Sequence, residues 1–82
     1  MPYIKQEERP KMDYIVASMI EAGVKADGKL NYVLCRLCKL TIKPSYNNYK
    51  NFIAELTEAA EHIRYKYLEK YEDDRMKEHG DI

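Results

Sequence analysis

Apolar residues recur at intervals of three and four along three stretches of this chain, which is the spacing of amphipathic helices. Pro10 suits the opening turn of the first helix, which Gly23 or Gly28 can end. Its apolar positions are Met12, Ile15, Val16, Met19 and Ile20. The second helix follows a cap at Asp27 and is closed by Pro44. Its apolar positions are Leu30, Val33, Leu34, Leu37 and Leu40.

The third helix is the longest, with Ser45 or Asn47 as its cap and an apolar stripe sustained for about five turns. The stripe consists of Tyr49, Phe52, Ile53, Leu56, Ala60, Ile63 and Tyr67. After Tyr71 the pattern gives way to a polar tail over about 72–82, which extends the helix by a turn or two. No segment has the alternation of a strand. The sequence therefore predicts an all-α fold, a three-helix antiparallel hairpin or bundle with a long third helix, completed by oligomerisation.

The length of the chain supports the prediction of a single small domain completed by oligomerisation. A chain of 82 residues makes one domain, 1–82, and buries only roughly 60–65% of its unfolded surface. A small helical chain gains stability by burying a face shared between subunits, and its eight tyrosines suit half-buried positions at such a contact. Alternatively, the tyrosines border the core of a monomer with their hydroxyls in water.

The expected location is the cytoplasm. Two cysteines, no signal peptide and no apolar run near the ~20 residues of a membrane span indicate a soluble protein in a reducing compartment. No membrane partner is expected.

Charge is segregated along the chain although the protein as a whole is neutral. Residues 1–50 carry a net charge of +4 and residues 51–82 a net charge of −4. Within the basic half, five residues at intervals of three and four fall on one line of the second helix, on a different face from its leucines. They are Lys29, Tyr32, Arg36, Lys39 and Lys43. Like charges at these spacings repel, so an anionic ligand beside them is stabilising, and a tyrosine among them can stack on a base. This set is the candidate ligand-binding site, and a nucleotide-sized anion suits it.

The same charges have a second interpretation, in which acids of the third helix pair with the bases of the second across an antiparallel hairpin. The acidic helix and tail are also a candidate protein-binding surface, because an acidic helix mimics the charge of a nucleic acid. The contact residues would be Glu55, Glu58, Glu61, Glu72, Asp73 and Asp74. Extended duplex nucleic acid is a poor partner for a chain of zero net charge.

Enzymatic and metal chemistry find little support. Cys35 and Cys38 have a C-x-x-C spacing, but zinc needs four ligands and the histidines, His62 and His79, lie far along the chain. The pair is expected to pack as small buried hydrophobes inside a helix. Consecutive acids at residues 72–74 point in different directions, which favours solvated charge over a metal site. No phosphate loop or nucleophile motif is present, so we expect no enzyme, no cofactor and no metal.

Four short motifs lie at the two ends of the chain and at the start of the second helix: Met1-Pro2-Tyr3-Ile4, Leu30-Asn31-Tyr32, Tyr71-Glu72-Asp73 and Gly80-Asp81-Ile82. With them the chain resembles, over its whole length, a family of small proteins encoded by tailed bacteriophages and prophages. The chain has Lys70 where the family pattern has proline. The resemblance implies a shared origin and fold rather than a mechanism.

Three functional hypotheses follow. Short phage proteins often act on the host by binding, and one strategy is to sequester the nucleotides that bacterial defence systems use as signals. The leading hypothesis is a small helical oligomer that binds such a nucleotide through the basic line. The others are an inhibitor or adaptor that binds a host protein through its acidic helix, and a small phage assembly component without a ligand.

Overall fold

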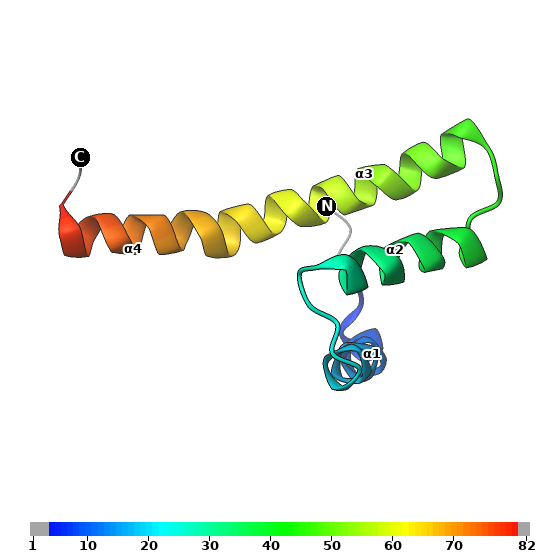
Figure 1. Ribbon diagram of the computed structural model, residues 1–82, viewed down its shortest axis with the longest axis horizontal. Helices are drawn as coiled ribbons and strands as arrows, with labels where there is room; N and C mark the ends of the chain where they lie inside the picture. The colour runs from blue at the N-terminus through cyan, green and yellow to red at the C-terminus, as the bar shows by residue number, and fades with distance from the viewer. Residues whose placement is uncertain (1–3, 81–82) are drawn as a thin grey trace. The chain divides into compact units, whose positions relative to one another are not determined.

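The structure is a computed structural model in which residues 4–80 are described; the termini at 1–3 and 81–82, which carry part of the sequence resemblance, lie outside this range. Every regular element within it is helical, which confirms the all-α prediction (Figure 1). The elements are the short 3₁₀ turn η1 (Gln6–Glu8) and the helices α1 (Arg9–Glu21), α2 (Gly28–Thr41), α3 (Tyr46–Ile63), η2 (Arg64–Leu68) and α4 (Glu69–His79).

The chain divides into two compact units, residues 1–40 and 41–82. In the first unit α1 is seen almost end-on in Figure 1 whereas α2 lies across the view, so the axes of the two helices point in clearly different directions. In the second unit α3, η2 and α4 follow one another without a break, as a single helix of 34 residues. At 1.5 Å per residue this helix is about 50 Å long. The predicted long third helix is therefore confirmed, and it includes most of the polar tail.

The first helix begins and ends where the sequence has suitable residues. Pro10 lies in the opening turn of α1, where its missing N–H costs no helical hydrogen bond. Gly23 follows the C-terminus with φ +82°, and its N–H donates to the Ile20 carbonyl at 3.0 Å. The Val24 N–H donates to the Met19 carbonyl, also at 3.0 Å. These two bonds form a Schellman motif, so Gly23, and not Gly28, ends the helix.

Gly23→Ala is expected to destabilise the protein, because an L-residue in the left-handed region costs about 1–2 kcal/mol. The measurement is the midpoint of urea unfolding, which should fall. Gly28→Ala is the matched control, since Gly28 has no positive φ and opens α2 in free space. Alanine there should leave the midpoint unchanged or raise it slightly. Equal losses for the two variants would contradict the role given to Gly23.

The predicted caps of the other two helices are confirmed. Asp27 caps α2, because its Oδ1 accepts from the Lys29 backbone N–H at 2.8 Å. Ser45 caps α3, because its Oγ accepts from the Asn48 backbone N–H at 3.0 Å. Asn48 in turn donates through its side-chain Nδ2 to the Lys43 carbonyl at 3.0 Å. Each cap satisfies a backbone donor that the first turn of a helix leaves without a partner.

The three apolar faces do not enclose a core in the part of the chain that the structure describes. Among residues 4–80 no side chain is buried. The half-buried apolar residues include Met19, Val33, Leu34 and Phe52, each from one of the predicted faces. Leu40, by contrast, is 69% exposed and Ile53 is 59% exposed. Each predicted apolar face does lie on a helix, as its spacing indicates. Completion of the fold by oligomerisation stays a prediction.

Candidate ligand-binding site

Four of the five predicted site residues lie together on α2. Lys29, Tyr32, Arg36 and Lys39 follow one another at intervals of three, four and three, so they form one line along the helix, here called the cationic line. All four side chains are exposed, and Tyr32 is 65% exposed. Within the described residues of their own unit, 4–40, none of the three cations forms an ion pair. The line therefore presents positive charge that its own unit does not neutralise.

Lys29 differs from the other cations of the line because it lies next to the end of α1. A methyl group placed on Gly23 would lie 3.6 Å from Lys29 Nζ. The ammonium group is therefore near the carbonyl end of α1, where the helix dipole favours a cation. Lys39 lies in the last turn of α2, where the dipole of its own helix favours a cation in the same way. Arg36, in the third turn of α2, has no helix end beside it.

Lys43, the fifth predicted residue, does not belong to the cationic line. The prediction placed it on the second helix, but α2 ends at Thr41, and Lys43 lies in the turn before α3. The cause is Pro44, whose ring disfavours helical backbone at the preceding residue and clashes with the carbonyl four residues back. Lys43 also belongs to the other compact unit. Its carbonyl has a structural role, as the acceptor for Asn48.

The acids of the alternative protein contact all lie on the long helix of the second unit. Glu55, Glu58 and Glu61 belong to α3, and Glu72, Asp73 and Asp74 to α4; all six are exposed. Within residues 41–80 none of the six forms an ion pair. The neighbouring pair of Arg75 Nη1 and Glu78 Oε2, 3.4 Å apart, is exposed and adds little stability.

The cysteine pair lies on α2 and differs in part from the prediction. Cys38 is half-buried, but Cys35 is exposed, and its Sγ donates to Asn31 Oδ1 at 3.2 Å. The expectation that both pack as buried hydrophobes is therefore wrong for Cys35. In the part of the chain that the structure describes, no three histidine, cysteine or acidic side chains are grouped closely enough to hold a metal ion.

A family model described as a domain of unknown function, DUF6899, matches residues 1–82. The chain belongs to this family. No curated protein and no solved structure matches it. The function proposed for this DUF6899 chain therefore rests on its own residues.

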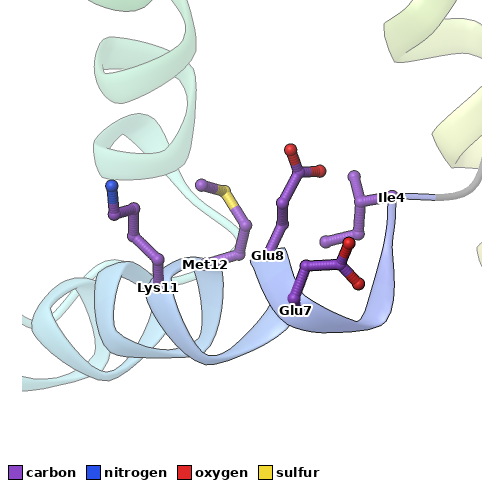
Figure 2. A pocket seen from close by; sticks show the side chains of 5 residues that line it. All are labelled: Ile4, Glu7, Glu8, Lys11 and Met12. Atoms are coloured by element: carbon purple, nitrogen blue, oxygen red, sulfur yellow. The ribbon is translucent and has the colours of Figure 1, made fainter.

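Three shallow hollows of the DUF6899 chain involve residues outside the cationic line. The first, about 390 Å³, lies where η1 meets α1 (Figure 2). Its lining includes the carboxylates of Glu7 and Glu8 and a single cation, Lys11, so it is a poor site for an anion. Sequence reasoning did not single it out, because its residues belong to an irregular turn and the helix that follows.

The other two hollows lie on the long helix. One, of about 260 Å³, is lined by Tyr46, Tyr49, Lys50 and Ile53, and Lys50 Nζ lies 5.8 Å from the centre of the Tyr46 ring. This cation–π pair was missed, although the spacing of four residues between Tyr46 and Lys50 signals it. The other, of about 300 Å³, is lined by Tyr65, Lys66, Glu69, Lys70 and Asp73, around η2.

None of the helices in residues 4–80 is both long and apolar enough to cross a membrane.

Proposed function

We propose that this protein is a non-enzymatic binding protein that holds an anionic nucleotide on the cationic line of α2. The observation that carries the proposal is that Arg36 and Lys39 are exposed, one turn apart, and without an acidic partner in their unit. Like charges at this spacing repel by ~0.2–0.5 kcal/mol per pair, and a bound anion reverses that penalty.

Tyr32, Arg36 and Lys39 offer the contacts that a nucleotide needs. Arg36 and Lys39 are separated by about 4.5 Å along the helix axis, so both can contact one phosphate group. The guanidinium of Arg36 can donate two parallel hydrogen bonds to phosphate oxygens, while Lys39 acts as a point charge. Tyr32 precedes Arg36 by about 6 Å along the axis, and its exposed ring can stack on the base. Lys29 would add a charge at the end of the line.

The resemblance to proteins of tailed phages supplies the biological context of the proposal. A phage protein that binds without catalysis would act by sequestering nucleotide signals of antiviral defence in the cytoplasm of the bacterial host. The chain needs no cofactor for this. A homo-oligomer would increase the number of sites per particle and place cationic lines of different subunits within reach of one ligand.

Replacing both Arg36 and Lys39 should abolish binding. Arg36→Glu with Lys39→Glu removes two charge-assisted contacts worth roughly 1.5–3 kcal/mol each, so we expect affinity for nucleotide to fall by about 100-fold or more. The measurement is native mass spectrometry of the full chain with a panel of cyclic and linear nucleotides. Lys5→Glu with Lys11→Glu makes the same change in net charge at exposed positions off the line, and it should bind as the parent does. Unchanged nucleotide binding by the Arg36 and Lys39 variant would contradict the proposal.

A second candidate function is capture of a host protein by the acidic surface of the long helix. It is favoured by the six exposed acids, none of which is paired within residues 41–80. Neutralising Glu55, Glu58 and Glu61 to glutamine would then release a stoichiometric protein partner, whereas the Arg36 and Lys39 variant would retain it. A chain that binds neither nucleotide nor a host protein, but is present in purified virus particles, would be an assembly component.

A further inference from the structure

The long helix contains one π turn. Residues Arg64–Leu68 form η2, and the Glu69 backbone N–H donates to the carbonyl of Arg64, five residues back. An α-helix would make this bond to the residue four back. The turn therefore holds one extra residue, and everything after it is rotated by about one residue, or roughly 100°, relative to an unbroken α-helix. Turns of this kind occur frequently at functional sites.

The extra residue brings Leu68 onto the apolar face of α3. In an unbroken helix Leu68 would follow Ile63 by five residues and point well away from it. With the π turn it takes the place that a residue four after Ile63 would have, and Tyr71 follows it one turn later. The apolar face thus continues from α3 into α4, over about 33 Å. We call this face the long-helix stripe; it consists of Tyr49, Phe52, Leu56, Ala60, Ile63, Leu68 and Tyr71.

The stripe is accessible over most of its length. Phe52 is half-buried and the other six residues are exposed. Ile63 is 57% exposed and Tyr71 is 62% exposed. A continuous apolar face of this length on a soluble helix marks a contact with another molecule.

The order of residues in the stripe points to a second copy of the chain as that molecule. The centre of the stripe lies between Ala59 and Ala60. Once the extra residue of the π turn is discounted, Tyr49 and Tyr71 lie at equal separations on either side of this centre. The same holds for Phe52 and Leu68, and for Leu56 and Ile63. A two-fold interface is self-complementary, so two antiparallel copies with this centre would bring each large residue opposite its counterpart. The small Ala60 side chain at the crossing lets the two helices approach closely.

The charges beside the stripe are complementary in the same arrangement. In an antiparallel pair centred between Ala59 and Ala60, Glu55 lies close to Lys66 of the second copy. On the other flank Lys50 lies between Glu69 and Glu72 of the second copy. A parallel pair in register would instead place Arg64 beside Lys66 and Glu72 beside Asp74, which repel. Charge thus favours the antiparallel orientation.

We infer that the protein forms an antiparallel homodimer through the long-helix stripe, with its two-fold axis between Ala59 and Ala60. The inference does not depend on the proposed nucleotide site, because the stripe and the cationic line share no residue and belong to different units of the chain. The dimer interface is built from α3 and α4, and the π turn is the device that makes the apolar face continuous between them.

Disulfide cross-linking of the full chain tests both the contact and its orientation. The background variant is Cys35→Ser with Cys38→Ser, which removes the native thiols. In this background Ala60→Cys should cross-link with itself under mild oxidation, because the two copies meet there. Leu56→Cys and Ile63→Cys should each fail to cross-link alone but should cross-link when mixed, since a disulfide requires Cα atoms within about 7 Å. Glu58→Cys, on the opposite side of the helix, is the control for random collision.

Each alternative outcome has a definite meaning. Self-cross-linking at Leu56, Ala60 and Ile63 alike would show a parallel pair and overturn the inference. Failure of Ala60→Cys to cross-link, or cross-linking no stronger than that of Glu58→Cys, would show that this face is not the contact.

Discussion

Aspartate at both Leu56 and Ile63 is expected to convert the protein from a dimer to a monomer. Each substitution places a carboxylate in the apolar interface, and the two-fold symmetry introduces every substitution twice. A charge buried without a partner costs several kcal/mol, so a loss of at least about 4 kcal/mol, or about 1,000-fold in the dissociation constant, is the expected scale. Sedimentation equilibrium at several protein concentrations measures it.

The matched control adds the same charge away from the stripe. Asn47→Asp with Asn51→Asp introduces two carboxylates on the opposite side of α3, at exposed positions. This variant should associate as the parent does. If the Leu56 and Ile63 variant kept the mass of the parent while remaining helical by circular dichroism, the stripe would not be the interface.

The second large effect concerns the length of the π turn. Inserting one alanine after Tyr65 should rotate Leu68 and Tyr71 away from the stripe by roughly 100°. The dimer would then lose two large side chains from each copy. Since burying each is worth about 1.5–3 kcal/mol, a weakening of about 1,000-fold or more is expected. The readout is again the mass as a function of concentration.

Deleting Tyr65 provides the opposite change at the same site. The deletion removes the extra residue, so the helix becomes a regular α-helix in which Leu68 and Tyr71 remain on the stripe. Association should be retained, with equal or greater helix stability. Equal effects of the insertion and the deletion would show that the alignment of α4 with α3 plays no part in assembly.

Much of the fold could be predicted because its signals are local. Apolar spacing identified all three helices, and the caps at Asp27 and Ser45 follow from side chains that bond the backbone two or three residues later. The end of α2 was placed too late because the pattern of basic residues continues to Lys43, whereas Pro44 prevents the helix from including that residue. Local stereochemistry prevailed over periodicity there.

The π turn could not be predicted from the apolar spacing. Tyr67 and Leu68 follow Ile63 by four and five residues, so the sequence offers an apolar residue for either an α turn or a π turn. The structure selects the wider turn, between Arg64 and Leu68. For the candidate site, the sequence correctly placed Lys29, Tyr32, Arg36 and Lys39 on one line. It could not show that Lys29 approaches Gly23, because that contact depends on how the chain folds back between α1 and α2.

The lack of a buried core in residues 4–80 has a consequence for the protein in a living cell. In the proposed dimer the long-helix stripe is covered, whereas a newly made chain displays it, and such surfaces are what chaperones and proteases recognise. Isolated chains would therefore be degraded faster than assembled ones. The amount of assembled protein would rise more steeply than the rate of synthesis, so that a low level of expression yields almost none.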